Sequence, residues 1–272
     1  MGGMTAARPR VTELASLSPS RASDFKVCPR LFRYRAVDRL ETPPTPQQAR
    51  GTTAHLALQR LFDLPPQDRT PERLFDLFRT AWMERKPVDY PDLFASVEEE
   101  RRWGTESLRV LANYFAVEDP REVEPVDREL DLVETFGAMR IRGILDRLDE
   151  DDDGLVVVDY KTGKAPPERF ALPAFFALKI YALLVRAHLG RTPTRLRLVY
   201  LGDATVYEIP VADAQLDAME RQLDALWTAI ERALERDEFP PRPGPLCAWC
   251  PFQERCPAFG GIDAPGDPVP EP

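Results

Sequence analysis

The sequence predicts a mixed α/β fold with a largely helical N-terminal part, and three observations support this prediction. Before residue 116, apolar residues recur at three- and four-residue steps, as on the buried face of a helix. After Pro125 the pattern changes to alternation on both sides of Gly137, which is typical of a β-hairpin. A continuous apolar run from Leu155 to Val158 then precedes longer apolar segments. This order indicates a buried central strand covered by helices.

Composition and charge limit the class of protein. Of the 272 residues, 43% are hydrophobic, which is enough for a buried core. The sequence shows no secretion leader and no apolar run long enough to cross a membrane, so we expect a cytoplasmic protein. The net charge of -9 argues against the basic surface usual for nucleic-acid binders. An enzyme that binds phosphates through metal ions remains compatible, because it needs only a local basic groove.

We expect one folded domain between two loose ends. Gly, Pro and acidic residues without apolar periodicity predict a disordered tail at 260–272, and residues 1–15 are expected to be flexible. The domain then covers residues 16–259. Its predicted parts are a mainly helical part at 16–120, an α/β core at 121–238 and a cysteine-containing segment at 239–259 that follows a Pro-rich helix stop.

The helical part begins at Ser18-Pro19-Ser20, where a hydroxyl residue precedes a proline, as at many helix starts. Residues 42–46 contain three prolines and are expected to be a linker. The next helix is expected to open at Gly51, which places His55 in its first turn. Further helices are predicted at 71–84 and 96–115.

The core is predicted as a three-stranded meander, a helix, two more strands and a final helix. The strands are expected at 128–136, 139–148, 155–159, 195–201 and 205–209. The helices are expected at 173–189 and 213–236.

Two carboxylates and a lysine give the sharpest chemical signal. Asp146 lies within the second predicted strand, and Asp159 follows four apolar residues at the end of the third, so both are expected at one end of the sheet. Such oxygen ligands suit a hard divalent cation that keeps waters for a phosphate. Lys161 projects to the same face as Asp159, where its charge can offset that of the phosphate. Singly, these residues are explained as strand-end acids and a solvated lysine; their combination favours a site.

Two histidines and a glutamate have weaker signals. A lone histidine such as His55 is more often a hydrogen-bonded structural residue than a metal ligand. His188 lies near a helix end before Gly190, where an interaction with the helix terminus is sufficient explanation. Glu129 precedes the hairpin turn and is either a site carboxylate or a solvent-facing strand residue.

All four cysteines fall into one pattern, with one near the N-terminus and three near the C-terminus: Cys28, Cys247, Cys250 and Cys256. In a cytosolic chain, a C-x-x-C pair with two further cysteines favours metal binding over disulfides. Two disulfides or free core thiols are the alternative. Four thiolates accept Zn²⁺ as well as iron, and spacing alone does not separate these metals.

Together these motifs resemble the RecB branch of the PD-(D/E)XK nuclease superfamily over most of the chain. The matched motifs are Ser-Pro-Ser at 18–20, Cys-Pro at 28–29, Gly-x-x-x-His at 51–55, Gly-x-x-Asp at 143–146 and Asp-Tyr-Lys-Thr-Gly at 159–163. The resemblance implies a restriction-endonuclease-like core, a central mixed sheet flanked by helices. It also implies hydrolysis of DNA phosphodiesters with Lys161 as the catalytic lysine. The implied ligands of Mg²⁺ or Mn²⁺ are His55, Asp146, Asp159 and the backbone carbonyl of Tyr160.

The sequence departs from the family pattern on the helix after the lysine motif. Family members usually carry Gln-x-x-x-Tyr there; Tyr181 matches, but Ala177 stands at the Gln position. The resemblance makes Tyr181 a further catalytic residue, because the pair helps to hold the active site and the nucleic acid. The missing amide predicts that another polar group substitutes or that activity is weakened.

For the cysteines, the resemblance to AddB-type and CRISPR-associated members implies a [4Fe–4S] cluster that joins both ends of the chain and is mainly structural. Basic and aromatic residues near these ends are candidates for contacts with single-stranded DNA, or for packing around the cluster. The candidates for DNA contact are Arg30, Arg33 and Tyr34.

We therefore expect a metal-dependent deoxyribonuclease, an exonuclease on single-stranded or end-exposed DNA. It would act in repair, recombination or CRISPR adaptation, with a helicase or other repair proteins as partners. One alternative is a catalytically weakened iron–sulfur subunit that binds DNA or serves as a scaffold. Another is an iron–sulfur redox regulator. The joint presence of Asp146, Asp159 and Lys161 disfavours both alternatives.

Overall fold

The computed structural model describes residues 16–261. The expected flexible N-terminus and residues 262–272 of the expected tail lie outside the described residues. Residues 260 and 261 belong to the folded part, because the N–H of Gly261 donates to the carbonyl of Cys256 at 3.0 Å.

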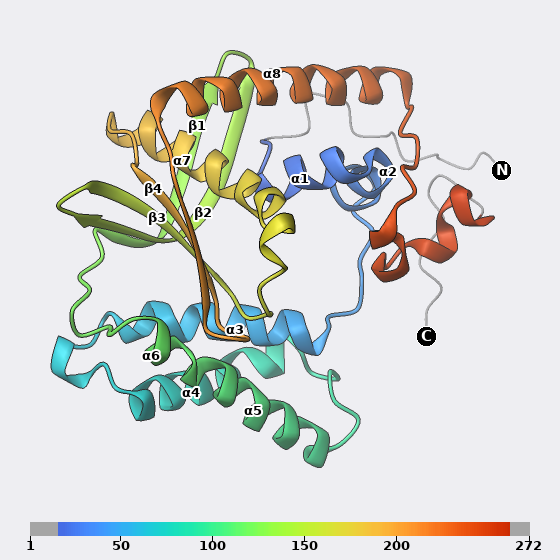
Figure 1. Cartoon of the computed structure of the whole chain (residues 1–272). Coiled ribbons are helices and arrows are strands. Elements are labelled where there is room, and N and C mark those ends of the chain that lie inside the picture. Colours follow the sequence, from blue (N-terminus) through green and yellow to red (C-terminus); the bar gives the residue numbers. More distant parts are fainter. Residues whose placement is uncertain (1–15, 262–272) are drawn as a thin grey trace. The chain divides into compact units, whose positions relative to one another are not determined.

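A five-stranded mixed sheet, in the order β1-β2-β3-β4-β5, is the centre of the fold (Figure 1). Strands β2 and β3 pair antiparallel, β3 and β4 parallel, and β4 and β5 antiparallel. Helix α7 (Phe175–Leu189) connects the parallel pair. The predicted class, a central mixed sheet flanked by helices, is confirmed. The strands are β1 (Asp127–Phe136), β2 (Met139–Asp151), β3 (Gly154–Lys161), β4 (Arg195–Tyr200) and β5 (Thr205–Pro210).

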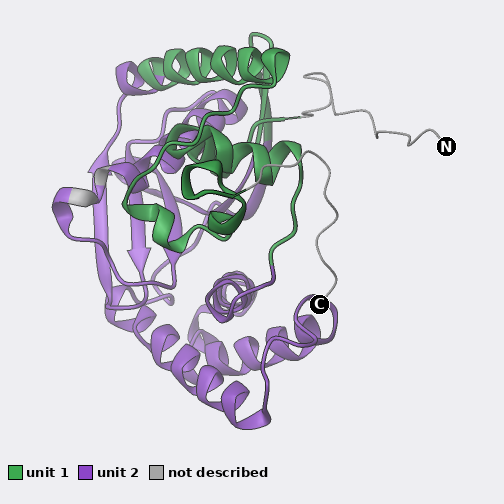
Figure 2. Ribbon diagram, turned by 90° about the vertical axis from the view of Figure 1, so that its right-hand side faces the viewer, with its two compact units in different colours: residues 1–42, 133–142, 217–272 green, residues 43–132, 143–216 purple. Residues whose placement is uncertain are grey.

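The chain divides into two compact units (Figure 2). Unit 1 comprises residues 1–42, 133–142 and 217–272, and unit 2 comprises residues 43–132 and 143–216. The helices of unit 2 before the sheet are α3 (Pro46–Leu61), α4 (Pro71–Asp89), α5 (Val97–Ala112) and α6 (Tyr114–Val117). Their buried faces share one apolar core with β3 and β4, which includes Leu58, Trp103, Val156 and Val199.

Helix α3 begins at Pro46, more than one turn before Gly51, so the predicted start is wrong. The cause is a capping box. The Thr45 hydroxyl accepts from the N–H of Gln48 at 3.2 Å, and the Gln48 side chain accepts from the N–H of Thr45 at 2.9 Å. Pro46 has the fixed φ that suits the first helical position. His55 therefore lies in the middle of the helix and not in its first turn.

Unit 1 contains α1 (Pro19–Val27), α2 (Pro29–Phe32), the π-helix η2 (Arg33–Val37) and most of α8 (Asp213–Arg236). Ser18 caps α1 as predicted, because its hydroxyl accepts from the N–H of Arg21 at 3.2 Å. Three short 3-10 helices follow α8: η6 (Pro245–Trp249), η7 (Gln253–Arg255) and η8 (Pro257–Phe259). Among residues 16–261, no helix has both the length and the apolar character needed to cross a membrane.

Candidate active site

Four elements of unit 2 bring the candidate site residues together. His55 is on α3, Glu129 on β1 and Asp146 on β2, whereas Asp159 and Lys161 are on β3. Strand β3 extends through Lys161, two residues beyond the predicted end. Asp159 and Lys161 therefore share one face of a regular strand, as the spacing predicts.

Asp146 forms the centre of a short hydrogen-bonded chain. One of its oxygens lies 3.2 Å from Nδ1 of His55. The other accepts from the backbone N–H of Tyr160 at 2.8 Å. The second ring nitrogen of His55, Nε2, lies 3.0 Å from the carbonyl oxygen of Tyr160. Three of the four predicted metal-binding groups are thus in direct contact.

The ligand atoms of His55, Glu129 and Asp146 all lie within 4.8 Å of one another. The structure therefore brings in Glu129, the weaker candidate of the sequence. Glu129 has φ 48°, a left-handed conformation that is rare for a residue with a side chain. Such a residue interrupts the regular alternation of a strand and redirects its side chain. A sequence pattern does not report this conformation.

Asp159 is buried beside this group and pairs with Lys161. Its Oδ2 lies 2.5 Å from Nζ of Lys161. The same oxygen is shielded from solvent, so the ammonium of Lys161 is the cation that compensates its charge. A buried carboxylate oxygen without a hydrogen bond is costly unless a cation compensates it.

Burial and neighbouring charges shift the pKa of three groups at this site. Burial, and then the charge of Asp146, raise the pKa of Asp159 to about 6, against the opposing effect of Lys161. Burial and the charge of Asp146 also raise the pKa of Glu129. Burial opposes protonation of His55, but the hydrogen bond and charge of Asp146 outweigh it and raise the pKa to about 8. The site accumulates negative charge that a cation would neutralise.

The donor set fits a hard divalent cation. It offers carboxylate oxygens, one backbone carbonyl and one imidazole, a set that Mg²⁺ and Mn²⁺ accept. The predicted residues His55, Asp146, Asp159 and Tyr160 and the additional Glu129 are thus available in one region of unit 2.

Tyr181 on α7 is half-buried, and its phenol lies within electrostatic range of the site. Burial raises its pKa above the ordinary value, and the charges of Asp159, Asp146 and Glu129 raise it further. The phenol therefore stays protonated and can act only as a hydrogen-bond donor or acceptor near neutral pH. Ala177 at the position of the family amide offers no polar side chain.

A buried ion-pair cluster on Arg147 was not predicted from the sequence. Its guanidinium is only 1% exposed. It donates to the hydroxyl of Tyr160 at 2.5 Å, to Glu118 at 2.9 Å and to Asp149 at 2.8 Å. Arg147 follows Asp146 on β2, so the two side chains leave opposite faces of the strand. The sequence signal for this cluster is an arginine within an apolar strand. Its partner Glu118 is distant in sequence, so the ion pair itself could not be predicted.

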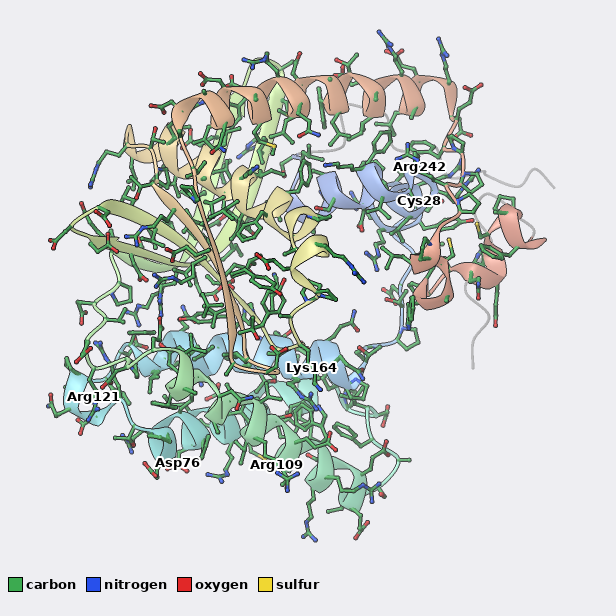
Figure 3. All side chains as sticks on the ribbon, viewed as in Figure 1. Cys28, Asp76, Arg109, Arg121, Lys164 and Arg242 are labelled. Carbon is green, nitrogen blue, oxygen red and sulfur yellow. The ribbon has the colours of Figure 1, made fainter. Side chains whose placement is uncertain are left out.

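The four cysteines gather in unit 1, around a cavity of about 260 Å³. All four are free thiols, so the two-disulfide alternative is not realised. The N–H of Arg242 donates to Sγ of Cys28 at 3.4 Å (Figure 3), and that of Gly244 donates to Sγ of Cys247 at 3.3 Å. Convergent thiols with N–H donors to sulfur fit a metal or an iron–sulfur cluster.

Two of the three expected DNA contacts are internal to unit 1. Arg33 is buried and its guanidinium pairs with Asp38 at 3.2 Å and with Asp237 at 3.4 Å. Tyr34 is buried and its hydroxyl donates to the carbonyl of Arg255 at 3.2 Å. Their side chains pack near the cysteine segment, which was the alternative explanation, so we do not propose either as a DNA contact. Arg30 is half-buried, with its guanidinium 5.9 Å from the ring centre of Tyr34.

Comparisons with known proteins identify the family of the chain and a structure with a similar fold. A family model described as "PD-(D/E)XK nuclease superfamily" matches residues 16–257. A crystal structure from Eubacterium rectale, described as "Putative exonuclease", matches with a TM-score of 0.57 and 12% identity over 98% of this chain and 97% of that chain. The structure of a protein called SSO0001 matches with a TM-score of 0.40 and 16% identity over 90% of this chain and 86% of that chain. No curated protein matches the sequence.

Proposed function

Because this chain belongs to the PD-(D/E)XK nuclease superfamily, we propose that it is a metal-dependent deoxyribonuclease. Its preferred substrate would be single-stranded or end-exposed DNA, from which it would remove nucleotides as an exonuclease. The observation that carries the proposal is the convergence of His55, Glu129 and Asp146 within 4.8 Å, beside the buried Asp159, which pairs with Lys161.

We assign the metal ligands as His55, Asp146, Asp159 and the carbonyl of Tyr160, with Glu129 as an additional carboxylate. A bound Mg²⁺ or Mn²⁺ would supply a water of lowered pKa and neutralise charge on the phosphate. The ammonium of Lys161 lies at the same face and would position this water and offset charge that develops on the phosphoryl oxygens. The pairing of Lys161 with Asp159 raises the pKa of the lysine despite its burial, so the side chain stays charged for this role.

Tyr181 would complete the polar contacts to the scissile group. Its phenol remains protonated near neutral pH, so it can donate a hydrogen bond to a phosphate oxygen or to a metal-bound water. Ala177 leaves this contact without the amide that other family members have. This feature favours the second candidate function, a catalytically weakened iron–sulfur subunit that binds DNA or serves as a scaffold.

Cleavage assays test the assigned site. We expect wild-type protein with Mg²⁺ or Mn²⁺ to shorten labelled single-stranded DNA, and chelator to stop the reaction. Asp159→Ala and Lys161→Ala should each lower the rate on the order of 100-fold or more. Lys164→Ala, in the exposed loop after β3 (Figure 3), is the matched control and should keep kcat. Wild-type rates in both site variants would contradict the assignment, and DNA binding without cleavage would favour the second candidate.

We further propose that Cys28, Cys247, Cys250 and Cys256 hold a [4Fe–4S] cluster with a structural role. The four thiols line one cavity and two accept hydrogen bonds from backbone N–H groups, an environment that suits cluster sulfur. Protein purified without oxygen should be brown and contain iron. A colourless protein with stoichiometric zinc would contradict the proposal. Nuclease activity that changes reversibly with cluster oxidation would favour a redox regulator.

The resemblance to the RecB branch suggests where such a nuclease would act. We propose a cytoplasmic enzyme of DNA repair, recombination or CRISPR adaptation that works with a helicase or other repair proteins, and a single nuclease domain over residues 16–259. Affinity purification of tagged protein from its host cells would test the partners. If the tagged protein is recovered without any DNA-processing protein, the proposed partners are contradicted.

A further inference from the structure

A larger cavity adjoins the candidate metal site within unit 2. It has a volume of about 550 Å³, and His55 and Glu129 form part of its wall. Because these two residues belong to the convergent metal-ligand group, a ligand in this cavity would lie next to the metal position. The wall also contains Gln48, Thr52 and Gln59 of α3 and Arg85 of α4.

The α3 part of the wall is a polar stripe that leads to His55. Gln48, Thr52, His55 and Gln59 are separated by four, three and four residues, so they follow one face of the helix. This stripe extends over about 16 Å at the rise of an α-helix. Amide and hydroxyl groups along such a stripe can hydrogen-bond to sugars and bases without selecting a sequence.

Arg85 is the cationic residue in this wall. Its Nη2 pairs with Asp89 at 2.8 Å within α4. Its Nε is buried and has no hydrogen-bond partner in the described part of the chain. The planar guanidinium has five N–H donors and matches the geometry of a phosphate group. The Arg85 side chain is 34% exposed, so a phosphate in the cavity would reach its exposed terminal N–H groups rather than the buried Nε.

Charge makes this arginine important for a polyanionic substrate. The chain has a net charge of -9, and the adjoining site contains Glu129, Asp146 and Asp159. These carboxylates repel a phosphate chain unless local cations compensate. Arg85 supplies such a charge. It comes from α4, whereas the metal-ligand candidates in the same wall, His55 and Glu129, come from α3 and β1.

We propose that this cavity is a subsite for an unpaired nucleotide adjacent to the scissile phosphate, with Arg85 bound to the neighbouring phosphate. This inference rests on the proposed nuclease function. A volume of about 550 Å³ is within the range of sites for one small ligand. A base that remains stacked within a duplex cannot enter such a site. The substrate class is therefore a single strand or a frayed end.

Two substrates separate the subsite from the metal site. Single-stranded oligonucleotide uses both, whereas bis(4-nitrophenyl) phosphate is a phosphodiester without a neighbouring nucleotide. With Mn²⁺, Arg85→Gln should raise KM for the oligonucleotide about tenfold or more and leave cleavage of the small substrate unchanged. Arg79→Gln is the matched control, because Arg79 is exposed on the same helix and pairs with Asp76. The control should match wild type on both substrates.

A binding measurement decides the question independently of turnover. With chelator present, Arg85→Gln should weaken binding of labelled single-stranded DNA and reduce its salt dependence by about 0.7 in the slope of log K against log salt. Arg85→Lys should restore that slope. Unchanged KM and affinity in Arg85→Gln would overturn the subsite, as would an equal loss on both substrates. Loss of binding in a protein that never cleaves DNA would overturn the nuclease function and keep the subsite.

Discussion

Tyr160 connects the candidate metal site with the buried cluster on Arg147. Its backbone N–H donates to Asp146 at 2.8 Å, and its carbonyl lies 3.0 Å from Nε2 of His55. Its hydroxyl lies 2.5 Å from Nη1 of Arg147. Arg147 also pairs with both oxygens of Glu118. A buried charge that loses its partner is left without hydration, so this cluster should affect stability more than surface ion pairs do.

Glu118→Gln tests this cluster through its pH dependence. Burial alone would raise the pKa of Glu118, but hydrogen bonds and the charge of Arg147 outweigh it, so the pKa is lowered. An acid with a lowered folded-state pKa stabilises the fold above its unfolded pKa, and this contribution is lost as pH falls through the folded value. We expect the variant to lose up to about 3–5 kcal/mol of unfolding free energy near pH 7. The difference from wild type should shrink below about pH 4.

Urea unfolding at several pH values measures this difference. Glu84→Gln is the matched control, because Glu84 pairs with Arg60 at 2.7 Å on the surface. Its effect should be much smaller, since exposed ion pairs contribute little. A difference between wild type and Glu118→Gln that grows on acidification would contradict the assigned sign.

At the scale of residues, sequence motifs predicted which residues gather at the site better than they predicted the burial and the partners of individual side chains. His55, Asp146 and Tyr160, which the resemblance implies as metal ligands, are in direct contact, and their binding of a metal stays a prediction. The position of Glu129 at the site was less predictable, because its positive φ depends on tertiary structure and is not visible in the sequence pattern. Arg33 was a candidate DNA contact because basic and aromatic residues gather near the cysteines, but in unit 1 its guanidinium pairs with nearby Asp38 and with Asp237, which is distant in sequence.

At the scale of elements, a close backbone approach holds the loop that follows β3. The N–H of Gly202 donates to the carbonyl of Gly163 at 3.0 Å, and the N–H of Leu201 donates to that of Lys161 at 2.8 Å. A Cβ atom at Gly202 would lie 2.5 Å from the carbonyl group of Gly163. Because the obstacle is backbone, one of the two loops must move to accommodate a side chain.

Gly202→Ala should therefore displace the loop next to Lys161. A shift on the order of 1 Å in a catalytic group can lower activity about 100-fold, and we expect a 10- to 100-fold loss of kcat on single-stranded DNA. Gly104→Ala is the control, because a Cβ atom there meets nothing within 4 Å. The control should keep full activity and gain up to about 1 kcal/mol of stability from helix propensity. Wild-type kcat in Gly202→Ala would contradict the positioning role of this contact.

Element types were predictable from periodicity, whereas some ends were not. The alternation around Gly137 and the apolar run of β3 correspond to observed strands, because burial of one or both faces imposes those patterns. The start of α3 was misplaced because Pro46 was counted with the linker prolines. The side chains of Thr45 and Gln48 decide this start through hydrogen bonds, which an apolar pattern does not report.

At the scale of the whole molecule, each candidate site is contained in one compact unit. The metal-ligand group and its adjoining cavity belong to unit 2, and the four cysteines belong to unit 1. Both sites combine segments that are distant in sequence: Cys28 meets residues 247–256, and His55 meets residues 129–160. Motif matches predicted these sets, but only tertiary structure could assign them to separate units.

This division predicts where each metal will stabilise the protein. Ligand binding to the folded state slows the openings that allow amide hydrogen exchange. Adding Mg²⁺ or Mn²⁺ at about 100 times its dissociation constant should slow exchange in α3, β2 and β3 by up to about 100-fold. Asp146→Asn should abolish this protection. Cys28→Ser should instead speed exchange over residues 239–261 of unit 1.

Hydrogen exchange read by mass spectrometry resolves these segments. Protection by Mg²⁺ confined to unit 1 would contradict the assigned ligands. Unchanged exchange at residues 239–261 in Cys28→Ser, with iron still bound, would contradict a structural cluster on four cysteines. Each change is expected to stay within its own unit, because neither site draws a ligand from the other unit. The free energy of metal binding then acts first on the backbone that supplies the ligands.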